Sequence, residues 1–204
     1  NCTGLKYPQP YGPRHDGTYA AMDCAKHCSN VQRFVRAARP GAFPDPDMLL
    51  IGQTTCSTVS QQQGMHCRAI TPIQEQTQMA LWAIFAAPLM MSNDLAAVSS
   101  TSRALLTNRE CLRINQDPLA LQGRRVVYNG FPYPQPSLQV WARDLQNGDV
   151  AVALYNFNHE PTSIVLNFTD VGYSSITAVR LLDVFGNGQV SNTTVHVGSW
   201  ISPM

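Results

Sequence analysis

Apolar residues in the first half of the chain form two kinds of run. Met48 to Ile51 is a short, continuous apolar run, which is typical of a strand buried on both faces of a parallel sheet. A longer segment begins at Thr71 and ends before Pro88, and its apolar residues occupy most faces of a helix. Thr71 suits a helix N-cap and Pro72 the first helical turn, so the pattern predicts a buried helix there.

Strands and helices alternate along this half of the chain. Leu89 to Met91 predicts a second short buried strand, and Thr101 to Leu106 predicts a short helix. This alternation indicates an α/β layer. Upstream, residues 1 to about 72 are irregular in pattern, with helical segments expected at Thr18 to Cys28 and Val31 to Ala38.

From near Gln122 the pattern changes to short segments in which apolar and polar residues alternate. Gly- and Asn-containing turn sequences separate these segments, which predicts an antiparallel β-sandwich of about eighty residues. We therefore divide the chain into an α/β part, residues 1–122, and a β-sandwich, residues 123–204. The strands are expected at Leu138 to Arg143, Val150 to Asn156, Ser163 to Phe168, Ala178 to Val184 and Thr193 to Val197.

Composition and charge exclude several classes of partner. The 204 residues suffice for one or two domains. Only 13% of them are charged and the formal net charge is +1, with no basic run, which argues against nucleic acid or an anionic membrane surface as the main partner. No apolar run reaches the roughly 20 residues of a transmembrane helix, so we expect no membrane span.

Six cysteines and three glycosylation sequons indicate an oxidising compartment. The sequons begin at Asn1, Asn167 and Asn192, and we expect a secreted glycoprotein modified at these positions. The chain begins with Asn rather than Met, which predicts a processed product or a part of a longer chain.

The cysteines also predict a local cross-link. Cys56 and Cys67 enclose a stretch of Ser, Thr and Gln residues, which predicts a surface loop closed by a disulfide worth roughly 2–3 kcal/mol. Zinc is the alternative for Cys24 and Cys28, but no second ligand pair with matching spacing follows. We therefore expect neither a metal ion nor a cofactor.

Three segments carry a resemblance to a known family. They are FPDPDMLLIG at residues 43–52, MALWAIFAAPLMMSNDL at residues 79–95 and INQDPL at residues 114–119. In this order they resemble glycoside hydrolase family 27, the α-galactosidases and α-N-acetylgalactosaminidases. The resemblance implies a (β/α)₈ TIM barrel followed by an antiparallel β domain, so residues 1–122 would be the C-terminal portion of the barrel.

The resemblance also implies roles for individual residues. Asp47 would bind sugar hydroxyls, Met48 would lie beside it at the sugar pocket, and Asp45 would be structural. The implied ligand is a terminal α-linked galactoside or an N-acetylgalactosamine-type sugar. For Asp94 we expect local hydrogen bonding to the backbone instead.

Four apolar side chains are expected in the core rather than at a ligand. Met90 and Met91 are assigned there because methionine commonly fills gaps between packed side chains. Trp82 lies in the middle of the predicted helix, and Trp141 is expected to pack within the β domain.

Both catalytic carboxylates of the family are missing from the pattern. Asn1-Cys2 resembles the residues that directly follow the family's nucleophilic Asp, which would place the nucleophile upstream of residue 1. The segment that should lead to the general acid runs from Phe34 to Arg39 without a carboxylate, and Phe43-Pro44 replaces the family's Trp-Asn. Because a retaining glycosidase needs two carboxylates about 5–5.5 Å apart, we predict no catalytic residue in this chain and no activity of the chain alone.

Two interpretations follow. In the first, the chain is the C-terminal part of a retaining α-galactosidase-like enzyme, and a second polypeptide, such as an N-terminal fragment of the same precursor, completes the barrel. A whole barrel takes roughly 250 residues, and a half-barrel would leave strand edges unpaired. In the second, the chain is a non-catalytic sugar-binding or structural secreted glycoprotein on the same scaffold. Either would function in an extracellular or lysosome-like compartment.

Overall fold

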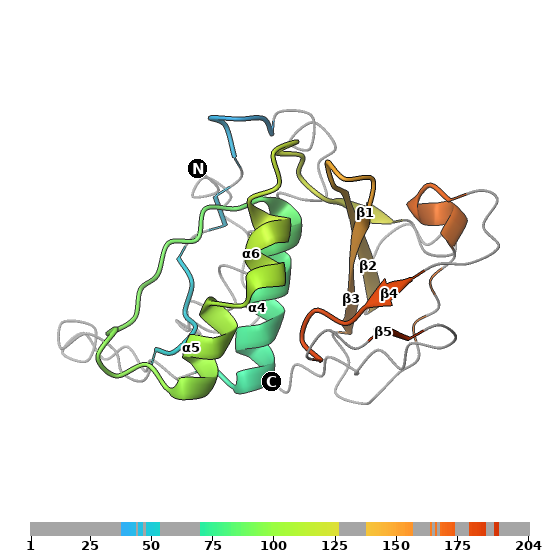
Figure 1. The fold of residues 1–204 in the computed structure, drawn as a ribbon. Helices are drawn as coiled ribbons and strands as arrows, with labels where there is room; N and C mark the ends of the chain where they lie inside the picture. Colours follow the sequence, from blue (N-terminus) through green and yellow to red (C-terminus); the bar gives the residue numbers. More distant parts are fainter. Residues whose placement is uncertain are drawn as a thin grey trace, which may run out of the picture.

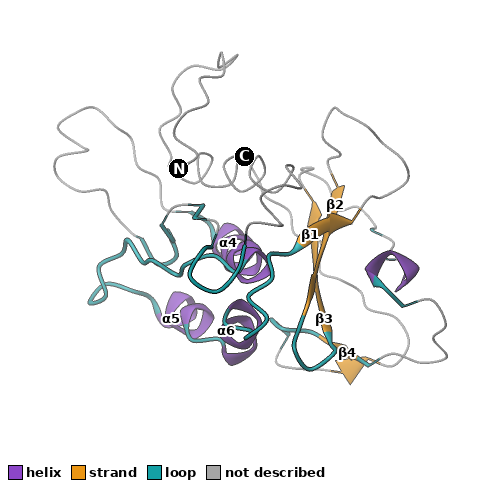
Figure 2. Ribbon diagram, turned by 90° about the horizontal axis from the view of Figure 1, so that it is seen from above, coloured by secondary structure: helices purple, strands orange, loops and turns teal. Residues whose placement is uncertain are grey.

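The structure is a computed structural model that describes residues 38–43, 45–46, 48–53, 70–126, 138–156, 164, 166, 168–173, 180–186 and 190–191. In this part of the chain, three helices lie together on one side and an antiparallel sheet lies on the other (Figures 1 and 2). The helices are α4 (Pro72–Phe85), α5 (Ser100–Leu106) and α6 (Arg109–Asn115). The strands of the sheet are β1 (Arg124–Val126), β2 (Leu138–Asp144) and β3 (Val150–Asn156).

Helix α4 begins and ends close to where the sequence predicts. The Thr71 hydroxyl accepts a hydrogen bond from the Gln74 N–H at 3.3 Å, and the Gln74 side chain accepts one from the Thr71 N–H at 2.8 Å. This reciprocal pair satisfies two backbone donors at the start of the helix. The helix ends at Ala86, whose φ of 54° lies in the left-handed region, two residues before Pro88. Trp82, expected in the core, is fully buried.

The two predicted strands of the α/β part meet in a single parallel bridge between Leu49 and Met91. Leu49 and Ile51 are buried, as predicted. The prediction of a buried strand at Leu89 to Met91 was wrong, because Met90 is 57% and Met91 43% exposed. Continuous apolar character suggested burial on both faces, whereas these two side chains stay largely uncovered.

Helix α5 matches the sequence prediction to within one residue at its start. Helix α6 was not predicted, although its N-cap carries a readable signal. The Asn108 side-chain oxygen accepts hydrogen bonds from the N–H groups of Glu110 and Cys111, at 3.1 and 3.0 Å. Asn at the cap followed by Glu in the first turn is a common helix start.

The sheet has the order β1-β2-β3, and both pairings are antiparallel. The strand predicted at 150–156 is confirmed, the one predicted at 138–143 is one residue longer, and β1 was missed. Gly148, with a φ of 86°, lies in the turn that joins β2 to β3, where a turn was expected. This turn needs the left-handed conformation that glycine adopts without strain.

Further along the chain the agreement is partial. Phe168 begins a 3₁₀ helix, η1 (Phe168–Val171), instead of ending a strand, because the chain turns back so that the Tyr173 N–H reaches the Phe168 carbonyl at 3.0 Å. Strand β4 (Leu181–Leu182) covers only part of the strand predicted at 178–184, and it pairs with β5 (Val190–Ser191). The strand expected at 193–197, the helix expected at 18–28 and residues 31–37 of the helix expected at 31–38 lie outside the described residues.

One continuous core joins the helices to the sheet. Helix α4 contacts both β2 and β3, and the Phe85 ring meets the Trp141 ring edge to face with centroids 5.2 Å apart. Trp141 is 1% exposed, as expected for a core residue, and packs in one cluster with both the α4 residues and Leu145 and Ala151 of the β region. The Gly123 N–H also donates to the Ile84 carbonyl at 2.7 Å, an approach that a Cβ atom would block.

A buried cation lies at this junction. Arg143 on β2 is 2% exposed, and its Nη1 atom donates to the Ala83 carbonyl at 2.6 Å and the Asn115 carbonyl at 3.2 Å. Both carbonyls belong to the last turn of a helix, α4 or α6, where the helix dipole favours positive charge. Burial lowers the pKa of Arg143, and the nearby Asp117 carboxylate acts in the opposite direction.

Among the described residues, no helix combines the length and the apolar character that crossing a membrane requires. The division of the chain at residues 122 and 123 stays a prediction. One buried cluster joins the helices to Trp141, Leu145 and Ala151, and a second cluster gathers Val126, Val140, Ala142 and Val171.

We expect the substitution Arg143→Met to lower the free energy of unfolding by about 2 kcal/mol, because the carbonyls of Ala83 and Asn115 lose a charged donor inside the core. Arg109, exposed at the start of α6, offers a matched control, and Arg109→Met should change the free energy by less than about 0.5 kcal/mol. Equilibrium unfolding in urea measures both. A neutral or stabilising Arg143→Met would mean that burying the cation opposes folding more strongly than its hydrogen bonds favour it.

Candidate functional site

Of the site residues predicted from the sequence, one lies in the described part of the structure. Met48 is described and is 40% exposed. The other assigned positions, Asp47, Cys56, Cys67, Asn1, Asn167 and Asn192, lie outside the described residues. Their expected roles in sugar binding, disulfide formation and glycosylation therefore stay predictions.

Met48 begins a segment, residues 48–52, that is held on both of its edges. On one edge the Leu49 N–H donates to the Met90 carbonyl at 2.7 Å, and the Leu49 carbonyl accepts from the Ser92 N–H at 3.1 Å. The Ser92 hydroxyl donates to the same carbonyl at 2.8 Å. Further along this edge, the Asn93 side-chain amide donates to the Ile51 carbonyl at 2.6 Å.

Side chains of α4 bind the opposite edge. The Leu50 N–H donates to Gln78 Oε1 at 2.8 Å, and Gln78 Nε2 donates to the Met48 carbonyl at 3.4 Å. The Gly52 N–H donates to Glu75 Oε1 at 2.7 Å. Gln78 is fully buried and Glu75 is 7% exposed, so these are interior hydrogen bonds rather than surface contacts.

Glu75 is a buried carboxylate that joins the segment to α5. Its second oxygen, Oε2, accepts from the Ser102 hydroxyl at 2.8 Å, so both oxygens have a donor. Glu75 and Gln78 lie about one helical turn apart, and this spacing places both on the side of α4 that faces the segment.

An exposed apolar surface accompanies this segment. Met48, Met90 and Met91 come from the two paired segments, and each is at least 40% exposed. The expectation that Met90 and Met91 lie in the core is therefore wrong, whereas the exposure of Met48 fits its expected place at a ligand site. Exposed methionines suit an adaptable apolar contact because the side chain is flexible and polarizable.

Asp94 follows this surface and has the local role that the sequence predicts. Its carboxylate accepts from the Ala96 N–H at 3.0 Å, and its carbonyl accepts from the Ala97 N–H at 2.9 Å. In the described ranges, no three His, Cys, Asp or Glu side chains gather into a group that could hold a metal ion.

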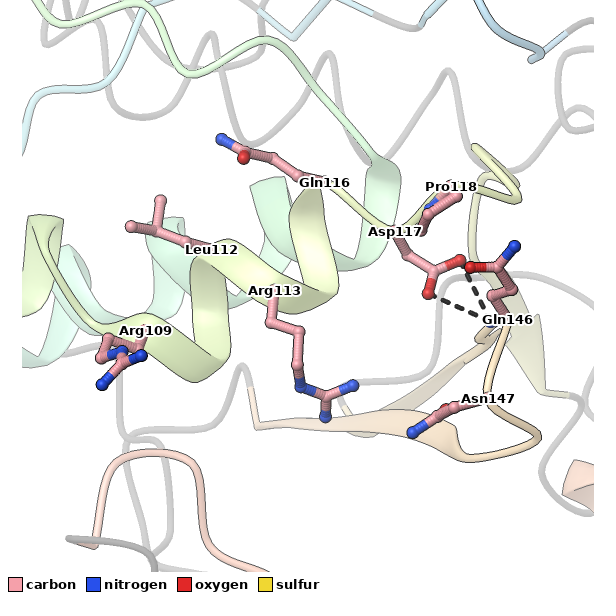
Figure 3. Close-up of a pocket in the computed structure, with 8 residues that line it drawn as sticks. All are labelled: Arg109, Leu112, Arg113, Gln116, Asp117, Pro118, Gln146 and Asn147. Carbon is pink, nitrogen blue, oxygen red and sulfur yellow. Dashed lines mark hydrogen bonds between the residues drawn. The ribbon is translucent and has the colours of Figure 1, made fainter.

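A hollow of about 480 Å³ lies elsewhere, between α6 and the β2–β3 turn (Figure 3). Its carboxylate, Asp117, accepts two bonds from the Gln146 N–H, at 3.0 and 3.2 Å, and one from the Leu119 N–H at 3.1 Å. The carboxylate is thus engaged in holding the β2–β3 turn against α6. The hollow is lined by Arg109, Leu112, Arg113, Gln116, Asp117, Pro118, Gln146 and Asn147. It contains neither Met48 nor a free carboxylate, so we do not assign the sugar site to it.

Two family models match the chain in order. The model described as Alpha galactosidase A matches residues 15–117, and the one described as the Alpha galactosidase C-terminal beta sandwich domain matches residues 135–199. The fold class is therefore the C-terminal portion of a TIM barrel followed by an antiparallel β-sandwich. The chain belongs to glycoside hydrolase family 27, the family of α-galactosidases and α-N-acetylgalactosaminidases.

Individual relatives agree with this assignment. Alpha-galactosidase A of Homo sapiens is 41% identical over 127 residues, which cover 62% of this chain and 25% of the human protein. Alpha-N-acetylgalactosaminidase of Gallus gallus is 33% identical over 155 residues, which cover 76% of this chain and 34% of the chicken protein. The chain thus spans about a third or less of the length of these two relatives.

The fold is also similar to that of a solved family 27 structure. The β-L-arabinopyranosidase of Geobacillus stearothermophilus superposes with a TM-score of 0.69 and a sequence identity of 24%, over 86% of this chain and 37% of that protein.

Cys111 on α6 is a free thiol in the core of this region, 1% exposed. Burial raises the pKa of the Cys111 thiol from its ordinary value of 9.0 to about 12, and the neighbouring Glu110 carboxylate adds to the effect. The other five cysteines lie outside the described residues.

The raised pKa predicts a specific loss of stability at high pH. Above pH 9 the thiol ionises in the unfolded chain but stays protonated in the folded one, so the free energy of unfolding should fall as pH rises from 9 toward 12. The slope from this group is about 1 kcal/mol per pH unit. Urea unfolding at several pH values should show this component of the slope disappearing in Cys111→Ala. Equal slopes in the two proteins would refute the prediction.

Proposed function

We propose that the protein is an α-galactosidase-like glycoside hydrolase to which this chain contributes part of the barrel and the β-sandwich. It hydrolyses terminal α-linked galactosides or N-acetylgalactosaminides and retains the configuration of the sugar. The observation that carries the proposal is the segment 48–52, which is tied to both the strand at Met91 and helix α4 and begins with an exposed Met48. The activities named for the human and chicken relatives support the substrate class.

In this proposal the chain supplies binding rather than the catalytic pair. Asp47 accepts hydrogen bonds from sugar hydroxyls, which discriminate between sugars most strongly when the acceptor is charged. Met48 contacts the apolar face of the same ring. The two carboxylates of the retaining mechanism come from outside this chain, from a second polypeptide that completes the barrel. The matched ranges 15–117 and 135–199 support the division of the chain at residue 122.

We also propose that the protein is secreted or enters a lysosome-like compartment. The six cysteines and the sequons at Asn1, Asn167 and Asn192 support this, because both are typical of chains that pass through an oxidising compartment. A disulfide between Cys56 and Cys67 belongs to the same proposal.

The proposal is tested with the protein expressed from its full coding sequence, using nitrophenyl α-galactoside and α-N-acetylgalactosaminide as substrates and the β-galactoside as a negative control. We expect Asp47→Asn to reduce kcat/KM for the preferred α-substrate by about 10- to 100-fold, because a charged acceptor of sugar hydroxyls becomes neutral. Asp94→Asn is the matched control and should leave kcat/KM within about twofold, since the Asp94 carboxylate accepts a hydrogen bond from the Ala96 N–H in its own turn.

Calorimetric titration with galactose distinguishes the alternatives. If the protein binds galactose, Asp47→Asn weakens this binding and no α-substrate is turned over, the non-catalytic sugar-binding interpretation is favoured. Neither binding nor turnover would contradict the proposed function.

A further inference from the structure

Gln78 stands apart from the other side chains of α4 in what it binds. It is fully buried in the middle of the helix, yet both ends of its amide are directed at the backbone of one segment, at Leu50 and Met48. Burying an amide without partners is unfavourable, so a side chain of this kind is retained in a core where its hydrogen bonds specify an arrangement.

The two edges of the segment alternate with residue number. In an extended strand, neighbouring residues direct their N–H and C=O groups to opposite edges. Leu49 and Ile51 meet the segment 90–93 on one edge. Met48 and Leu50 are thereby turned to the other edge, where both meet Gln78 of α4, and the Gly52 N–H, in the turn that follows, meets Glu75.

Gln78 acts on this second edge as a substitute for a peptide group of a third strand. Its Oε1 accepts from the Leu50 N–H and its Nε2 donates to the Met48 carbonyl, so it supplies an acceptor and a donor as a neighbouring strand would. The acceptor contact at 2.8 Å is the shorter of the two, and the donor contact at 3.4 Å is at the long end of the range. The Leu50 N–H is therefore the group most dependent on Gln78.

We propose that Gln78 is a positioning residue for sugar binding, which fixes the backbone that carries Met48 and directly follows Asp47. This inference rests on the proposed function. Glu75 holds the far end of the segment at Gly52, so loss of Gln78 frees the end next to the expected sugar ligands and leaves the other end tied. A ligand side chain whose backbone shifts in this way loses affinity without losing its own chemistry.

The test compares Gln78→Met with Gln76→Met in the protein expressed from its full coding sequence. Gln76 lies two positions away on the same helix and is only partly buried, so it receives the same substitution in a different environment. Deuterium exchange of the peptide covering residues 48–53 reports on the Leu50 N–H, and kinetics with the preferred α-substrate report on binding. For Gln78→Met we expect exchange in this peptide to become about tenfold faster and KM to rise about tenfold, with kcat within about twofold. For Gln76→Met we expect neither change.

A conservative variant keeps the test informative if Gln78→Met does not fold. Gln78→Glu retains an acceptor for the Leu50 N–H but, when ionised, has no donor for the Met48 carbonyl. It should preserve most of the protection from exchange while KM rises by a smaller factor than in Gln78→Met.

The outcomes separate the two proposals. Unchanged exchange at residues 48–53 in Gln78→Met overturns the positioning role, whatever the activity. The positioning role is also overturned if exchange becomes faster in Gln78→Met while KM stays unchanged. The same holds if KM changes by the same factor in Gln78→Met and Gln76→Met. If the unmodified protein neither hydrolyses nor binds any α-galactoside, the proposed function has failed and the sugar-binding role of Gln78 fails with it, while the exchange result still reports whether Gln78 holds the segment.

Discussion

Burial of α4 on nearly all sides is the constraint on which the described structure depends. The helix contacts α5, α6, β2 and β3, and its residues form the centre of the core that joins barrel-derived and sandwich-derived segments. A helix in this position must supply hydrogen-bond partners to the buried polar groups of its neighbours, because water cannot do so there. It does so with side chains of its N-terminal half, Glu75 and Gln78, and with backbone carbonyls near its C-terminus, such as those of Ala83 and Ile84.

The two ends of α4 differ in the hydrogen-bonding groups that they offer to their neighbours. Near the N-terminus the partners are backbone N–H groups, and the helix supplies acceptors to them. At the C-terminus the carbonyls lack donors within the helix, and Arg143 of the sheet supplies one. Because the cation comes from β2 and the acceptors from α4 and α6, this contact also fixes the sheet relative to the helices. The edge-to-face contact of Phe85 with Trp141 adds apolar burial at the same junction.

Local signals in the sequence predicted where helices and strands lie. Which side chains are buried between them depends on contacts between residues far apart in the chain. Thr71 and Pro72 located the start of α4, and the alternation at 150–156 located β3, because capping and period-two patterning are properties of a few neighbouring residues. The sequence could not assign Trp141 to the shared core, since its partner Phe85 lies far away in the chain. Met90 and Met91 were misplaced for a similar reason, as apolar character does not say whether a covering element exists. Of the candidate site, Met48 was found through the family resemblance, whereas Gln78 and Glu75 carried no motif.

The alternating contacts of residues 48–52 explain why two family segments that look independent in the sequence belong together. In the first segment the contacts come from backbone groups of residues 49–51. Their partners are backbone and side-chain groups in the second segment, 79–95, and the side chain of Gln78 just before it. The side chains of this segment divide between the core, where Leu49 and Ile51 are buried, and the surface, where Met48 is 40% exposed. The position of Gly52 favours glycine, because its φ is 76° and an added Cβ atom would lie 3.1 Å from a Val98 methyl group. Helix α4 thus holds the backbone beneath the exposed Met48, through Gln78 at one end of the segment and Glu75 at the other.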